Sequence, residues 1–206
     1  MRIERIEKSK HKQERVLVFL EGGDLLRITG AELLRFGLYK GMDLSPALVV
    51  ELQAAAQQSQ LKQTAARMAS GRMLSKKEVQ HRLTKKGATE EQAADTADWL
   101  ETLGAVDDEG YAGVIARHYG AMGYGPGRVK QDLHRRGVPR ELWDKALAQL
   151  PPAADAVREV VAARLRGRPM TQEDSRKLAA ALQRRGFSWN DIRPVLNEWG
   201  QEIDET

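Results

Sequence analysis

Apolar residues near the N-terminus fall in short runs that are typical of β-strands. The apolar run Val16–Leu20 is separated from a second run, Leu25–Ile28, by Gly22-Gly23. Two such runs across a glycine pair predict a β-hairpin, because glycine readily adopts the positive φ that a tight turn requires. The segment Arg2–Glu7 predicts a third strand beside the hairpin. We therefore expect a small β-containing piece over residues 1–45.

From Pro46 onward the apolar residues follow helical spacing, and the pattern repeats. The segments LTKKG (83–87), LHRRG (133–137) and LQRRG (182–186) share a leucine, any residue, two basic residues and a glycine. Their glycines lie 50 and then 49 residues apart. An apolar residue precedes each leucine by four positions, which indicates one buried helical face. Repetition at this period is typical of one supersecondary unit that is used again.

Further helices are predicted on both sides of each basic pentapeptide. Apolar residues recur six, ten and thirteen positions after each glycine, as in an amphipathic helix. They are Ala93, Ala97 and Leu100, then Trp143, Leu147 and Leu150, then Ile192, Leu196 and Trp199. Matching apolar pairs precede the pentapeptides at Leu61 and Ala65, Tyr111 and Ile115, and Val161 and Leu165. Helix starts are predicted by sequences that resemble capping boxes, at Ser75, Thr89 and, imperfectly, Ser188. We expect a mainly α fold with three tandem three-helix repeats, over residues 46–104, 105–150 and 151–206.

Composition narrows the class of protein. The 206 residues include 33 Lys plus Arg and 29 Asp plus Glu, for a net charge of +4. The absence of cysteine excludes disulfides, thiolate nucleophiles and zinc–thiolate sites, and fits a reducing cytosol. No apolar run approaches the roughly 18 to 20 residues of a membrane span, and the N-terminus has no signal-peptide core. We expect a cytoplasmic protein without a membrane partner.

The segment GYGPGRVKQDLHRRG (123–137) has the glycines of a phosphate-binding loop. It lacks the Gly-Lys-Ser/Thr of a Walker loop, and no strand precedes it as a dinucleotide site requires. We favour a helix start with Gly125 as N-cap and Pro126 at the first helical position. Asp107, Asp108 and Glu109 could bind a divalent ion, but an N-terminal cap is the favoured interpretation. His118 stands at the repeat position of Met68, so we expect it to pack in or beside the core. The histidines form no known catalytic set, so we expect no catalytic, cofactor or metal site.

A basic pair lies at the same place in each predicted repeat, and with further basic residues nearby these pairs form the candidate binding surface. They are Arg82, Lys85, Lys86, Arg128, Lys130, Arg135, Arg136, Arg164, Arg166, Arg168, Arg184 and Arg185. Cations in a last helical turn favourably offset the helix dipole, which explains their position without any partner. Regularly spaced cations also suit a repeating polyanion or a polymer with acidic patches. Charge alone leaves both interpretations open.

Several motifs together resemble a known family. A Ser-x-x-Glu capping box leads to LTKKG, LGAVDDEGYA (103–112) follows, and GYGPGRVKQDLHRRGV (123–138) comes next. In this order they resemble the RecX family of bacterial regulatory proteins, which modulate the recombinase RecA. FGLYKGMDLS (36–45) is similar to the head segment of some members, so the resemblance covers nearly the whole chain. The third repeat departs from the signature because it lacks the Gly-Pro pair.

The resemblance implies a fold and a function. RecX-like proteins are elongated, curved arrays of three-helix repeats that lie in the groove of the RecA–DNA filament. They inhibit its ATPase, strand-exchange and coprotease activities and promote its disassembly, with a part in recombination, repair and the SOS response. We therefore expect a non-enzymatic monomer without cofactors, whose partners are the RecA filament and single- and double-stranded DNA. The alternative is a stand-alone DNA-binding protein with helix-turn-helix-like units.

One expectation concerns the central basic pair. If the basic clusters bind a partner, replacing Arg135 and Arg136 by glutamate should weaken association with filament or DNA. Thermal stability should then change little, because neither side chain would support the fold.

Overall fold

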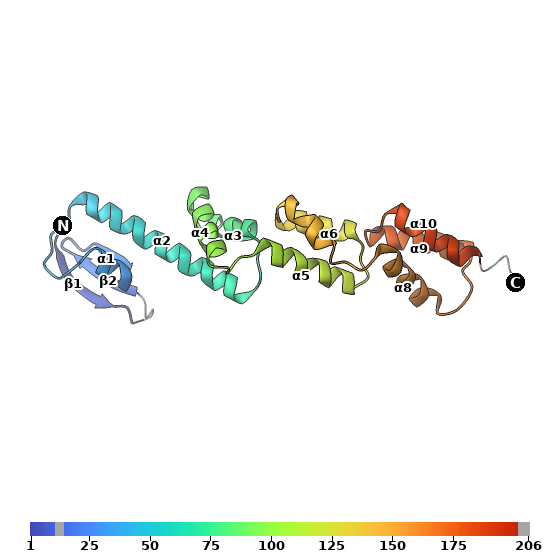
Figure 1. The fold of residues 1–206 in the computed structure, drawn as a ribbon. Helices are drawn as coiled ribbons and strands as arrows, with labels where there is room; N and C mark the ends of the chain where they lie inside the picture. The colour runs from blue at the N-terminus through green and yellow to red at the C-terminus, as the bar shows by residue number, and fades with distance from the viewer. Residues whose placement is uncertain (11–14, 202–206) are drawn as a thin grey trace. The chain divides into compact units, whose positions relative to one another are not determined.

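The computed structural model describes residues 1–10 and 15–201 (Figure 1). The predicted N-terminal piece and third repeat also include residues 11–14 and 202–206, which lie outside the described residues. The N-terminal piece is an antiparallel sheet in the order β1 (Ile3–Lys8), β2 (Arg15–Leu20) and β3 (Leu25–Thr29). Gly22 and Gly23 have φ values of 98° and 90° in the turn between β2 and β3. The predicted hairpin and the third strand are both confirmed.

One face of the sheet is buried by helices. Along β2, buried residues alternate with half-buried ones, as expected where a sheet packs on one side only. The buried residues Val18, Leu26 and Ile28 share a core with Leu52 of the long helix α2 (Pro46–Gly71). The short helix α1 (Gly30–Arg35) begins with a capping box between Thr29 and Glu32. Glu32 is buried, and its carboxylate accepts a hydrogen bond from the Ser59 hydroxyl of α2.

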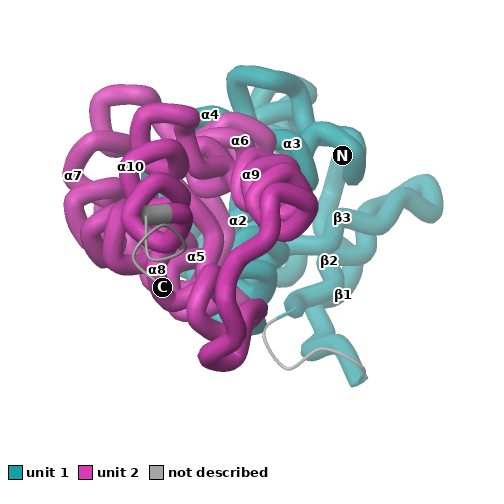
Figure 2. The backbone as a smooth tube through the Cα atoms, turned by 90° about the vertical axis from the view of Figure 1, so that its right-hand side faces the viewer, with its two compact units in different colours: residues 1–71, 80–100 teal, residues 72–79, 101–206 magenta. Residues whose placement is uncertain are grey.

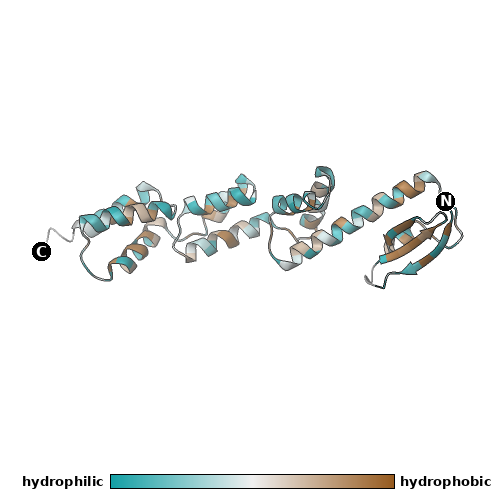
Figure 3. Ribbon diagram, turned by 180° about the vertical axis from the view of Figure 1, so that it is seen from behind, coloured by the Kyte–Doolittle hydropathy of each residue, from teal (hydrophilic) through white to brown (hydrophobic). Residues whose placement is uncertain are grey.

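The remaining helices have the predicted order. They are α3 (Lys76–Thr84), α4 (Glu90–Thr102), α5 (Asp108–Ala121), α6 (Pro126–Arg136), α7 (Trp143–Leu147), α8 (Ala153–Leu165), α9 (Gln172–Arg184) and α10 (Trp189–Gln201). Apolar stretches alternate with polar ones along these helices (Figure 3). In the part of the chain that the structure describes, no helix is both long enough and apolar enough to cross a membrane.

The repeat signature has a clear local cause. Gly87, Gly137 and Gly186 have φ values of 94°, 68° and 88°, so each follows its helix in the left-handed conformation that favours glycine. The leucine of each pentapeptide is fully buried. The predicted capping boxes at Ser75, Thr89 and Ser188 all form, and the structure adds a further one between Thr171 and Asp174.

Two expectations were wrong, one about the length of a helix and one about the burial of a side chain. The predicted helix through Trp143, Leu147 and Leu150 is a 3₁₀ turn (Arg140–Leu142) followed by the five-residue α7, which ends before Leu150. Its fully buried residue is Ala146, while the three larger side chains are half-buried against the same core. His118, expected in or beside the core because of its repeat position, is exposed and contacts Tyr119 edge to face.

The chain forms two compact units (Figure 2). One consists of residues 1–71 and 80–100, and the other of residues 72–79 and 101–206. The boundary passes through α3 and therefore through the predicted first repeat. The second unit holds two apolar cores, one shared by α5, α6 and α7 and one shared by α8, α9 and α10. The division into repeats 46–104, 105–150 and 151–206 stays a prediction.

Candidate partner-binding surface

The glycine-rich segment before α6 packs against the end of α9. The Gly125 N–H donates to the Arg185 carbonyl at 2.9 Å, and the Gly127 N–H donates to the Gly186 carbonyl at 2.9 Å. A Cβ atom at Gly125 would lie 2.7 Å from the Gly186 oxygen, so the backbones approach too closely for a side chain. These amides are bonded within the chain, so they do not form a phosphate cradle. The predicted cap, Gly125 followed by Pro126, is confirmed.

The start of α3 meets the end of α6 in a comparable way. The Ser75 hydroxyl donates to the Arg136 carbonyl, and the Lys77 side chain packs where a Cβ atom at Gly137 would lie. The Lys76 N–H donates to the Asp108 carboxylate at 2.8 Å. Burial raises the pKa of the Asp108 carboxyl, although the bond from Lys76 opposes this shift. Asp107 caps α5, and no cluster of possible metal ligands occurs among the described residues.

Arg136, a predicted binding residue, lies in a network inside the second unit. Its Nε donates to the buried Asp132 carboxylate at 2.8 Å, and Nη1 donates to the Tyr111 hydroxyl. Glu78 lies 3.6 Å from the same nitrogen. Burial disfavours the Asp132 carboxylate, but hydrogen bonds from Arg136 and Arg135 outweigh this and hold its pKa below the ordinary value. Arg136 therefore supports the fold, whatever else it does.

Two other predicted residues also have internal partners. Arg185 donates to the Gly123 carbonyl at 3.2 Å, and its guanidinium lies over the Tyr124 ring. Arg168 makes two hydrogen bonds to Asp174, at 2.6 and 2.8 Å. The pKa of Asp174 is consequently far below its usual range. Arg135 touches Asp132 too, but its side chain stays 70% exposed.

The other predicted residues make fewer polar contacts within the chain. Arg128 is exposed, with its guanidinium 5.8 Å from the Tyr119 ring centre. Arg82 is half-buried, and the rest are exposed, namely Lys85, Lys86, Lys130, Arg164, Arg166 and Arg184. Ion pairs within the described residues involve none of these eight side chains. They remain available to a partner.

A groove of about 860 Å³ in the second unit gathers three of the predicted residues. It lies between the end of α5 and the helices α8 and α9, and its walls carry Arg164, Arg184 and Arg185. Apolar residues such as Met122, which is 50% exposed, contribute to the lining. The carboxylates on the lining are Glu159 and Asp174, the latter already bonded to Arg168. The groove thus combines apolar surface with an excess of positive charge.

Lys177 completes this rim and was missed in the sequence. It lines the same groove from α9 and also pairs with Glu173 at 2.6 Å. Lys177 precedes Arg184 by seven residues, which is about two helical turns and therefore the same helix face. This spacing was the signal that could have found it.

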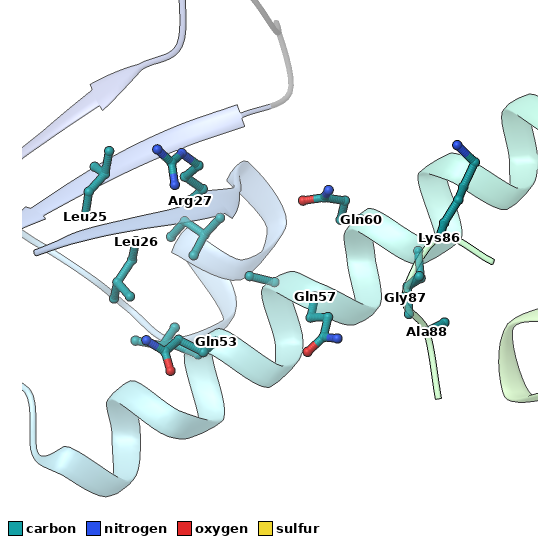
Figure 4. A pocket seen from close by; sticks show the side chains of 13 residues that line it. Leu25, Leu26, Arg27, Gln53, Gln57, Gln60, Lys86, Gly87 and Ala88 are labelled. Carbon is teal, nitrogen blue, oxygen red and sulfur yellow. The ribbon is translucent and has the colours of Figure 1, made fainter. Parts of the chain in front are cut away.

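A second groove, of about 370 Å³, lies within the first unit (Figure 4). Strand β3 forms one wall, α2 forms another, and the turn Lys86–Ala88 closes one end. Of the predicted binding residues, Lys86 belongs to this groove, while Lys130 lines a further hollow beside Phe187 in the second unit. The two grooves and the hollow therefore each include different predicted residues.

Two segments of the helical region match models of a known protein family. Residues 107–147 match the family model for the second three-helix domain of RecX, and residues 154–196 match that for the third. These segments correspond to α5–α7 and α8–α10, apart from a few residues at their ends.

Curated relatives extend the similarity to nearly the whole chain. The chain is 30% identical over 205 residues to the regulatory protein RecX of Lactobacillus delbrueckii subsp. bulgaricus, covering 96% of this chain and 74% of that one. It is 32% identical over 150 residues to the regulatory protein RecX of Mycolicibacterium smegmatis, covering 68% of this chain and 79% of that one.

Solved structures show the same fold. A crystal structure of regulatory protein RecX matches with a TM-score of 0.77 at 23% identity, over 95% of this chain and 98% of that one. A RecX structure from Lactobacillus salivarius matches with a TM-score of 0.61 at 20% identity, over 69% of this chain and 96% of that one. With the identities of the curated relatives, these matches establish that the chain belongs to the RecX family of regulatory proteins.

Proposed function

We propose that this protein regulates RecA by binding the RecA–DNA filament, as the resemblance to RecX implies. Binding in the filament groove would inhibit ATP hydrolysis, strand exchange and coprotease activity and would promote disassembly. Family membership is the observation that carries this proposal. The protein acts through binding and needs no cofactor.

The basic groove between α5, α8 and α9 is the surface that we assign to this contact. Arg164 and Arg184 are exposed on its rim and make no ion pair with the described residues. The filament presents both DNA phosphates and protein, and a groove with cations above apolar surface can bind either. Because exposed cations act through long-range attraction, salt should weaken the contact.

The alternative of a stand-alone helix-turn-helix reader is less well supported. A recognition helix places its N-terminal residues against base edges in the major groove. The N-terminus of α6 is covered by the Gly186 backbone, and that of α3 lies against the Arg136 carbonyl. The first turn of α4 carries Glu90 and Glu91, which would repel phosphates. Tight, sequence-selective binding to duplex DNA without RecA would nevertheless favour this alternative.

The test is a titration into RecA on single-stranded DNA, with ATP hydrolysis as the readout. Substoichiometric wild-type protein should depress the rate, and Arg164→Glu/Arg184→Glu should need about tenfold more protein for the same effect. The control is Arg176→Glu/Arg193→Glu, which changes two exposed arginines outside the groove by the same charge.

The outcomes separate the function from the site. An unchanged hydrolysis rate with wild-type protein, together with no co-sedimentation with the filament, would refute RecA regulation. If both double variants lose inhibition of ATP hydrolysis equally, the groove is not the contact, and the loss reflects only the change in total charge.

A further inference from the structure

Strand β3 has an open edge. It pairs with β2 on one side, and the Leu20 N–H donates to the Asp24 carbonyl at 2.9 Å where that pairing begins. Bonded and non-bonded residues alternate along an antiparallel pair, so Leu26 and Ile28 bond to β2. The N–H and C=O groups of Leu25 and Arg27 therefore point away from β2. Within the described residues, no backbone hydrogen bond satisfies these outward groups.

The groove of the first unit runs along this edge. Four consecutive residues, Leu25–Ile28, line it. Side chains of successive strand residues point to opposite faces of a sheet, so four in a row line one groove only where the groove follows the strand's edge. Glutamines of α2 form the opposite side (Figure 4), at Gln53, Gln57 and Gln60. Their spacing places all three amides on one face of α2.

The charge of this groove has one sign. Among the 13 residues that line it, Arg27 and Lys86 are charged, and neither has an ion-pair partner within the described residues. No carboxylate lines the groove. Backbone groups, three amides and two cations at a strand edge suit an extended backbone with negatively charged side chains. A second copy of this chain fits poorly, because it would bring another Arg27 to the same edge.

We propose that an extended acidic peptide segment of a partner protein binds here as a fourth strand beside β3. Its backbone pairs with Leu25 and Arg27, and its carboxylates lie near Arg27 and Lys86. An exposed strand edge is a template for such addition, in which main-chain bonds give affinity and side-chain pockets give specificity. This proposal does not rest on RecA regulation, since the groove lies in the first unit and the filament contact was assigned to the second.

The test uses the full-length protein and a fluorescein-labelled peptide of alternating glutamate and valine, followed by fluorescence anisotropy. Arg27→Ala removes the charge, and Arg27→Pro removes the charge and the outward N–H, which is not used by β2. We expect binding to weaken in the order wild type, Arg27→Ala, Arg27→Pro, with the proline variant about tenfold weaker than the alanine variant. Lys86→Glu should also weaken binding.

A matched peptide keeps the test independent of whether the proline variant folds. Methylation of alternate backbone nitrogens preserves the carboxylates but removes the donors on one edge, so it should abolish binding to wild-type protein. The proposal is overturned if the unmethylated peptide does not bind, or if the methylated peptide binds equally well. It is likewise overturned if light scattering shows a dimer that Arg27→Pro dissociates, since a second copy would then occupy the edge.

Discussion

At the scale of single residues, Gly125 gives the sharpest test of the packing between α6 and α9. Its φ of −87° is ordinary for any residue, so only the missing side chain explains a glycine there. We expect Gly125→Ala to lower the free energy of unfolding by about 1–3 kcal/mol, because the methyl group would overlap the Gly186 backbone. Urea denaturation followed by circular dichroism measures this change.

Gly30 supplies the control for that prediction. It begins α1, and a Cβ atom there would meet no atom within 4 Å. Gly30→Ala should therefore leave stability unchanged or raise it by up to about 1 kcal/mol, through the lower entropy of the unfolded chain. Similar losses in both variants would show that close packing is not why position 125 is glycine.

Arg135 and Arg136 are expected to behave differently although they are neighbours. Arg136→Ala would leave the buried Asp132 carboxylate with fewer donors and should cost about 2 kcal/mol, a figure reduced because the arginine is 30% exposed. Arg135→Ala should cost less than about 1 kcal/mol, because its side chain is 70% exposed. Thermal or urea denaturation of the two single variants would test this.

The same contrast corrects the expectation that the double glutamate variant would keep its stability. A glutamate at position 136 would lie near Asp132 and Glu78 and would destabilise the fold. Binding experiments should therefore change Arg135 and leave Arg136 intact. If Arg136→Ala unfolds no more readily than Arg135→Ala, the network contributes nothing measurable.

The Asp132 carboxylate should make the free energy of unfolding depend on pH in the acidic range. Its pKa is lower in the folded protein than the ordinary value of 3.8, so its carboxylate stabilises the fold above that value. This contribution is lost as the pH falls through the folded-state pKa. The stability advantage of wild type over Asp132→Asn should hold near neutral pH and shrink as the pH falls below 3.8. If the stability advantage of wild type instead grows on acidification, folding raises the pKa of Asp132, which contradicts this prediction.

At the scale of elements, local signals were enough to predict most of the fold. The Gly-Gly pair predicted the hairpin, and Ser75, Thr89 and Ser188 predicted helix starts, because each signal acts within a few residues. The length of α7 was missed, since apolar spacing continued to Leu150. Leu150 precedes Pro151, and a residue before proline disfavours the helical conformation. That local restriction outweighs the helical spacing.

Helix α10 carries a proline in its interior that offers a test at this scale. Pro194 is the sixth residue of the helix and is exposed. Because proline has no backbone N–H, one hydrogen bond within the helix is missing at this position. Pro194→Ala should raise the free energy of unfolding by about 1–3 kcal/mol. A loss of stability in chemical denaturation would mean that the proline ring makes packing contacts that outweigh the missing bond.

At the scale of the whole molecule, the sequence predicted where the cations lie but not which of them already have partners within the chain. The repeats located the three basic pairs, and the other six predicted cations were found because they lie near those pairs in the sequence. Which of them are occupied depends on partners distant in the chain, such as Tyr111 for Arg136 and Gly123 for Arg185. Those partners appear only once helices from separate segments pack together. For the same reason, nothing in the sequence indicates that Arg164 and Arg184 line one groove.

Net charge provides a prediction for the molecule as a whole. Each Arg→Glu change lowers the charge by two, so Arg164→Glu/Arg184→Glu and Arg176→Glu/Arg193→Glu both take it from +4 to zero. Raising the salt concentration should weaken the proposed inhibition of RecA by wild type and by the Arg176/Arg193 variant in parallel. The Arg164/Arg184 variant should respond less. A shared response of all three proteins would mean that total charge, and not its placement, governs binding.

The contact between the start of α6 and the end of α9 also has an electrostatic consequence. A helix carries about half a positive charge at its N-terminus and about half a negative charge at its C-terminus. Where α6 meets α9 these opposite partial charges lie together and largely cancel, so the nearby Arg184 keeps its full attraction for an anion. Within the described residues, no backbone N–H of another helix bonds to the last carbonyls of α3, so its negative partial charge offsets part of the attraction of Lys85 and Lys86. Equal formal charges in the repeats therefore present unequal fields to a phosphate or carboxylate.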